Sequence, residues 1–177
     1  QEGATIEDLI EGRSSTTANR TSLISATLTS IVFGMFDAHS KNIFIDNEGN
    51  IKFFDNTRNM PNTNQFIDRG DALICPFRSA LLGMPGTEQA LTPLEIEQLK
   101  LELATYEAKM VDLESFLSSK QTQALIAQLP AGWMNAGDAL TAMRERIATL
   151  KNSLDSPSKF SLRDLMLNSN PHFKLTT

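Results

Sequence analysis

Two aspartates and an asparagine are the side chains of this sequence whose types and spacing suit a chemical role. Asp37 lies five residues before Asn42, and Asp55 lies thirteen residues after Asn42. Magnesium prefers oxygen ligands and is usually held by one or two side chains together with nucleotide phosphates. Asn42 and Asp55 are therefore the predicted metal ligands. Asp37 is the predicted acid that orients an attacking hydroxyl and accepts its proton, as phosphoryl transfer requires.

The elements around these residues are predicted to bring them together. Apolar residues recur at helical spacing from about residue 19 to 36, which predicts a buried helix just before Asp37. Two apolar runs at 42–45 and 51–54 flank a turn-forming segment, which indicates a β-hairpin. Such a hairpin would return Asp55 to the side of Asn42. Residues 56–71 are rich in Asn, Thr, Arg and Asp and are predicted to form a long loop.

The rest of the sequence is predicted to be helical. A capping box from Thr92 to Glu95, with proline at the first helical position, opens a long helix to about residue 118. Further helices are predicted at about 5–10, 120–128 and 135–154, and after a cap at Ser161. The predicted fold class is mainly α with a small β-hairpin, an α+β arrangement. Four acidic residues of the long helix are predicted to form a solvated face: Glu95, Glu97, Glu102 and Glu107.

Length and composition restrict the classes of protein and partner. The 177 residues are enough for one domain, and the net charge of −5 argues against a nucleic-acid partner. The single cysteine, Cys75, excludes an intramolecular disulfide and a cysteine-based zinc cluster. No apolar run approaches the ~18 residues that a membrane span needs. We therefore expect no membrane span, although peripheral membrane contact is compatible with the sequence, and a cytoplasmic location.

The order helix, D-x-x-x-x-N, hairpin and second aspartate resembles the catalytic and metal-binding loops of the protein-kinase-like superfamily. His39 extends the first motif to D-x-H-x-x-N, which looks more like phosphatidylinositol 3-/4-kinases and their atypical relatives. Residues 55–61 resemble the metal loop of type II phosphatidylinositol 4-kinases. The resemblance implies a single kinase-like C-lobe over residues 1–177. The catalytic helix and both loops would occupy 19–58, and a helical C-terminal part would occupy 92–177.

The resemblance also assigns roles by position. It makes Asp37 the catalytic-loop acid, with His39 as a structural or phosphate-facing residue of the same loop. Lys41 and Asn42 would contact bound ATP, and Asn42 and Asp55 would bind Mg²⁺ or Mn²⁺. The implied activity is that of an ATP-binding kinase, a transferase whose acceptor is a hydroxyl of a phosphoinositide lipid or of a protein.

The sequence departs from this family in ways that keep alternatives open. Ala38 stands where the family usually has an arginine, and Asn56 and Thr57 replace a motif that contains glycine. A glycine-rich phosphate loop and a strand lysine are missing, so we expect a fragment that is inactive without the N-lobe of a larger parent chain. One alternative is a pseudokinase or helical interaction module. Another is a small-molecule kinase of the aminoglycoside phosphotransferase type. A divergent kinase of this kind is also compatible with a secreted bacterial effector in a host cytosol.

Overall fold

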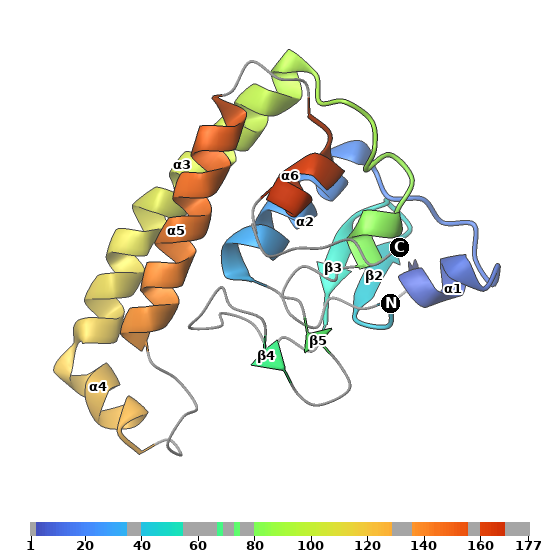
Figure 1. Ribbon diagram of the computed structural model, residues 1–177. Coiled ribbons are helices and arrows are strands. Elements are labelled where there is room, and N and C mark those ends of the chain that lie inside the picture. The colour runs from blue at the N-terminus through green and yellow to red at the C-terminus, as the bar shows by residue number, and fades with distance from the viewer. Residues whose placement is uncertain are drawn as a thin grey trace.

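A computed structural model describes residues 3–34, 40–54, 67–68, 73–74, 80–128, 136–155 and 160–168 of the chain (Figure 1). This part is mainly α-helical with a small antiparallel sheet, which confirms the predicted fold class. The strands are β1 (Gly3–Thr5), β2 (Ile43–Asp46), β3 (Ile51–Phe53), β4 (Ile67–Asp68) and β5 (Leu73–Ile74). The α-helices are α1 (Ile6–Ile10), α2 (Arg20–Phe33), α3 (Pro93–Ser118), α4 (Lys120–Ile126), α5 (Ala136–Leu154) and α6 (Leu162–Asn168), and a 3-10 helix lies at Ala80–Gly83.

The predicted hairpin is present and gains a third strand. β2 and β3 pair antiparallel with Ile43 opposite Phe53 and Ile45 opposite Ile51. β1 adds to the other edge of β2, with Thr5 opposite Phe44. This strand was not predicted, because three residues are too few to show an alternating pattern.

A second strand pair lies where a structureless loop was predicted. β4 pairs antiparallel with β5, and its two residues, Ile67–Asp68, fall inside the predicted loop at 56–71. The prediction of a continuous loop is therefore wrong at this position. The strands are two residues long, so the polar composition around them hides the short apolar segments from a pattern search.

Helix α2 forms the centre of the hydrophobic core. It packs against β3, α3, α5 and α6. Because neighbours surround it, its apolar residues do not form a single stripe, and most of the helix is buried. Its buried residues are Leu23, Ile24, Ala26, Thr27, Leu28, Ser30, Ile31 and Val32.

Helices α3 and α5 form a long antiparallel pair beside this core (Figure 1). The predicted capping box begins α3: Thr92 accepts a hydrogen bond from the backbone N–H of Glu95, and Glu95 accepts one from Thr92 in return. The predicted core stripe of α5 is buried at Leu140, Met143, Ile147 and Leu150.

The prediction that the glutamates of α3 form a solvated face is wrong for Glu95 and Glu102, which are partly buried against α2. Glu95 receives a hydrogen bond from Arg20 of α2 at 2.8 Å, and Glu102 receives one from Ser25 of the same helix. The side chain of Glu107 is 41% exposed, as predicted, and forms a surface ion pair with Lys151 of α5 at 2.8 Å. These carboxylates connect α3 to its two neighbouring helices.

A close approach between the β2–β3 turn and α2 leads to the first testable prediction. Gly49 has a φ of +82°, and a Cβ at this position would lie 2.8 Å from the backbone nitrogen of Asn19. Gly12 is a matched control because its φ is +70° and a Cβ at that position would meet nothing within 4 Å. Gly12→Ala should lower the free energy of unfolding by about 1 kcal/mol, from left-handed backbone strain alone. Gly49→Ala should lower it by about 3 kcal/mol, because overpacking adds to the same strain.

Urea unfolding of the three proteins, followed by circular dichroism, measures both values. Equal destabilisation in the two variants would show that the turn does not press against the start of α2.

Candidate functional site

The start of α2 is tied to the hairpin by one hydrogen bond between backbone groups and by others that involve side chains. The backbone N–H of Asn19 donates to the carbonyl of Gly49 at 2.8 Å, and its side-chain amide donates to the carbonyl of Glu48 at 3.2 Å. One helical turn later, the Ser22 hydroxyl accepts the backbone N–H of Ile51 at 2.7 Å. Helix and hairpin are therefore held in one fixed relation. The elements that flank all three predicted site residues belong to this unit.

The turn of the hairpin is held by a buried carboxylate. Asp46, 6% exposed, accepts the backbone N–H of Asn50 at 2.8 Å and forms an ion pair with Lys52 at 2.8 Å. The hydrogen bond from Lys52 and that from the Asn50 backbone lower the pKa of Asp46 to about 2. Asp46 is therefore ionised at neutral pH, and its role is to shape the turn.

At its open end, the hairpin fixes the backbone beside two predicted site residues. The N–H of Phe54 donates to the carbonyl of Asn42 at 2.8 Å, which extends the ladder beyond Ile43 and Phe53. The ring of Phe54 meets the ring of Phe44 edge to face, with centroids 5.8 Å apart. The chain therefore continues to residue 55 from a position directly across the ladder from Asn42.

Glu7 of α1 holds the segment that enters the hairpin. Its backbone N–H donates to the carbonyl of Ser40 at 3.1 Å, and its carboxylate lies 3.4 Å from the ammonium group of Lys41. The Lys41 side chain is 67% exposed, so this ion pair contributes little to stability. An exposed ammonium group at this place is accessible to an anion from solvent.

The structure thus places two of the five predicted site residues. Lys41 and Asn42 adjoin each other at the open end of the hairpin, whereas Asp37, His39 and Asp55 lie outside the described residues. Across the described ranges, no group of three His, Cys, Asp or Glu side chains is arranged to hold a metal ion. Of the two predicted metal ligands, Asn42 lies within the described residues and Asp55 does not. An amide oxygen such as that of Asn42, together with carboxylate oxygens, suits a hard cation such as Mg²⁺.

Two residues that support this site, Glu7 and Arg146, were not predicted from the sequence. Arg146 of α5 is buried against the C-terminal end of α2, where its guanidinium donates to the carbonyl of Val32 at 3.2 Å. Its position between Met143 and Ile147 was a usable signal, since a charged residue inside an apolar helical stripe requires a partner. Glu7 gave no such signal because acidic residues are ordinary in a first helical turn.

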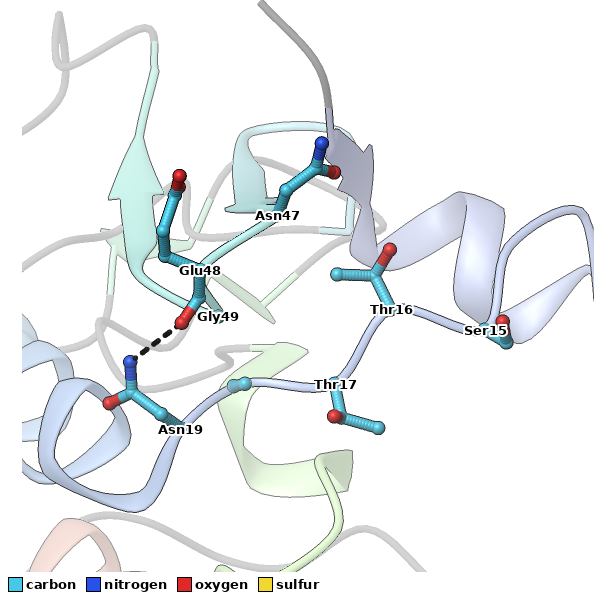
Figure 2. A pocket seen from close by; sticks show the side chains of 8 residues that line it. Ser15, Thr16, Thr17, Asn19, Asn47, Glu48 and Gly49 are labelled. Atoms are coloured by element: carbon cyan, nitrogen blue, oxygen red, sulfur yellow. Dashed lines mark hydrogen bonds between the residues drawn. The ribbon is translucent and has the colours of Figure 1, made fainter.

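A polar pocket of about 450 Å³ lies at the other end of α2 (Figure 2). Its walls come from the segment before α2 and from the turn of the hairpin. With 14 residues, α2 is about 21 Å long, so this pocket lies far from the C-terminal end of the helix at Gly34. It offers hydroxyl and amide groups and one carboxylate but no basic side chain, which makes it a poor site for a nucleotide phosphate. The lining residues are Ser15, Thr16, Thr17, Ala18, Asn19, Asn47, Glu48 and Gly49.

Comparisons of the chain with protein-family models, with curated proteins and with solved structures give no significant match. Within the described ranges, none of the helices has the length and apolar character that crossing a membrane requires.

The pKa of Asp46 leads to the second testable prediction. Its carboxyl is more acidic in the folded protein, at about 2, than its ordinary value of 3.8. Folding therefore gains stability from Asp46 above about pH 4, and this gain is lost as the pH falls from about 4 to 2. The free energy of unfolding should drop more steeply over this range in the wild type than in Asp46→Asn.

Urea unfolding of both proteins between pH 2 and pH 7 measures this difference. Asp8, whose pKa is also lowered to about 2 by hydrogen bonds from Thr5, is present in both proteins and cancels in the comparison. Parallel pH profiles would show that Asp46 makes no special contribution in the folded state.

Proposed function

We propose that this chain is the C-lobe of a kinase-like phosphotransferase that uses ATP with Mg²⁺ or Mn²⁺. The acceptor is a hydroxyl of a phosphoinositide lipid or of a protein. The observation that carries the proposal is the hydrogen bond between Phe54 and Asn42 at the open end of a hairpin that is itself tied to α2. This hydrogen bond holds Phe54, the residue before Asp55, beside Asn42 on a hairpin that packs against α2.

This arrangement supports the proposal through what phosphoryl transfer demands. The reaction needs positioned groups and neutralised charge more than covalent work from the protein. The described residues on either side of the stretch 35–39 are each held: Gly34 caps α2, and the carbonyl of Ser40 accepts a hydrogen bond from the backbone of Glu7. Both supports are packed elements, and packed elements position functional groups better than loops alone.

Each predicted residue has a separate task in this proposal. Asp37 orients the acceptor hydroxyl and takes its proton. Asn42 and Asp55 hold the metal ion, which neutralises negative charge on the phosphates when it is bound. Lys41, exposed beside Asn42, contacts a phosphate oxygen, and His39 shapes the loop. The glycine-rich loop and strand lysine that cover ATP in such enzymes would come from an N-lobe outside these 177 residues.

A second candidate is a pseudokinase or interaction module with the same fold. It is favoured by Ala38, which has no side chain to anchor the loop, and by the absence of glycine at positions 56 and 57. The two candidates differ in turnover, so the following test separates them.

The third testable prediction concerns the two aspartates. In the full-length protein that contains this chain, Asp37→Ala and Asp55→Ala should each lower Mg²⁺-dependent phosphate transfer from ATP by about 100-fold or more, through loss of the base and of a metal ligand. Asp112→Ala is the matched control because Asp112 is exposed on α3, and its activity should equal that of the wild type. Transfer is measured with labelled ATP to phosphatidylinositol vesicles, to casein and to water.

Full activity in both aspartate variants would refute the assigned roles. A wild-type protein that binds ATP without transferring phosphate to any of these acceptors would establish the pseudokinase candidate instead.

A further inference from the structure

Arg146 is a charged residue inside the hydrophobic core. It is 1% exposed and lies on the face of α5 that also buries Met143, Ile147 and Leu150. Burial lowers the pKa of its guanidinium to about 10, so the group is still cationic at neutral pH. Taking a cation out of water costs free energy unless it is paired, and a residue chosen only to fill space would be apolar.

The guanidinium lies against the last turn of α2. Its Nη1 donates to the carbonyl of Val32 at 3.2 Å. A Cβ built on Gly34 would lie 2.7 Å from both Cζ and Nη1 and 2.9 Å from Nη2, so the group rests directly on this glycine. The carbonyls at the end of a helix are unpaired within the helix and carry the negative end of its dipole, which a cation stabilises.

Gly34 is the residue at which α2 ends. It has a left-handed backbone, with φ at +55° and ψ at +60°, and its N–H donates to the carbonyls of Ile31 and Ser30. Any side chain at this position would displace the guanidinium. Arg146 and Gly34 therefore fit one another, and together they set where α2 stops.

This helix end leads directly to the predicted catalytic loop, because Asp37 follows Gly34 by three residues. We propose that Arg146 is a positioning residue of the phosphotransferase, which holds the Val32 carbonyl and Gly34 and thereby fixes the helix end from which the predicted catalytic loop begins. This inference rests on the proposed function. It deepens that function by adding a residue from α5, 114 positions away from Val32 in the sequence, to the support of the site.

A role in packing alone makes a different prediction from a role in positioning. Methionine fills much of the same space without the charge and the planar hydrogen-bond donors, and lysine keeps the charge without the planar group. Loss of packing affects the free energy of unfolding. Misplacement of a catalytic group lowers kcat even in a protein that is fully folded, because small displacements of reacting groups cost about 100-fold in rate.

The fourth testable prediction therefore separates kcat from stability in the full-length protein. At a temperature well below each Tm, Arg146→Met should lower kcat for Mg²⁺-dependent phosphate transfer by about 100-fold and Arg146→Lys by about tenfold, with KM for ATP within about twofold of the wild type. Lys151→Met is the matched control, since Lys151 is exposed on the same helix and pairs with Glu107. It should leave kcat unchanged.

Asp37→Ala, assayed in parallel, distinguishes failure of this inference from failure of the proposed function. Wild-type kcat in Arg146→Lys, or in a folded Arg146→Met, overturns the positioning role while an inactive Asp37→Ala leaves the proposed function standing. The lysine variant decides the matter if the methionine variant does not fold. Full activity in Asp37→Ala, or an inactive wild type, overturns the proposed function and the positioning role with it.

Discussion

The burial of α2 is the constraint on which the rest of the structure depends. Eight of its 14 residues are buried, and they face the sheet as well as three other helices. A helix packed on several sides cannot shift or rotate without disturbing every neighbour, because protein interiors are packed to the density of crystals. Its ends are fixed as well. Asn19 and Ser22 form hydrogen bonds that tie its start to the hairpin. At its other end, Arg146 donates to the carbonyl of Val32 and packs against Gly34.

Polar contacts decide how the long helices attach to this centre. Arg20 of α2 binds Glu95 at 2.8 Å and also donates to the carbonyl of Gly86, so one side chain joins the start of α2 to the start of α3. The hydrogen bond from Arg20 lowers the pKa of Glu95, which therefore stays ionised in the capping box of α3. The same carboxylate thus begins a helix and fixes its position. Further along α3, Tyr106 and Phe33 meet edge to face with ring centroids 5.7 Å apart.

The functional proposal follows from how these constraints converge around one short stretch of chain. Glu7 holds Ser40 and Lys41 on one side, Arg146 holds Gly34 on the other, and the ladder bond of Phe54 fixes Asn42. Supports from α1, α5 and the end of β3 thus flank the segment that carries the D-x-H-x-x-N motif.

Local patterns in the sequence were sufficient for most helices and for the hairpin. Thr92 and Glu95 indicate the start of α3 because a capping box lies within four consecutive residues, and the turn formers at 46–50 indicate β2 and β3 because a turn and its strands are contiguous. The aspartates and the asparagine of the candidate site were also visible in the sequence, since their spacing is itself the signal. What local patterns missed were β1, β4 and β5, whose two or three residues are too short to carry a period.

The sequence by itself determined where the helices begin, which of their faces are apolar, and which residues could bind a metal ion or take a proton. Only the tertiary structure decided which charges are partnered inside the protein. Glu95 and Glu102 resemble a solvated face until α2 is placed beside them, and Arg146 resembles an ordinary helix residue until its guanidinium meets Val32 and Gly34. The physical reason is that capping and periodicity act over a few neighbouring residues. A charge and its partner, by contrast, are brought together by the fold from positions 114 residues apart in the case of Arg146 and Val32.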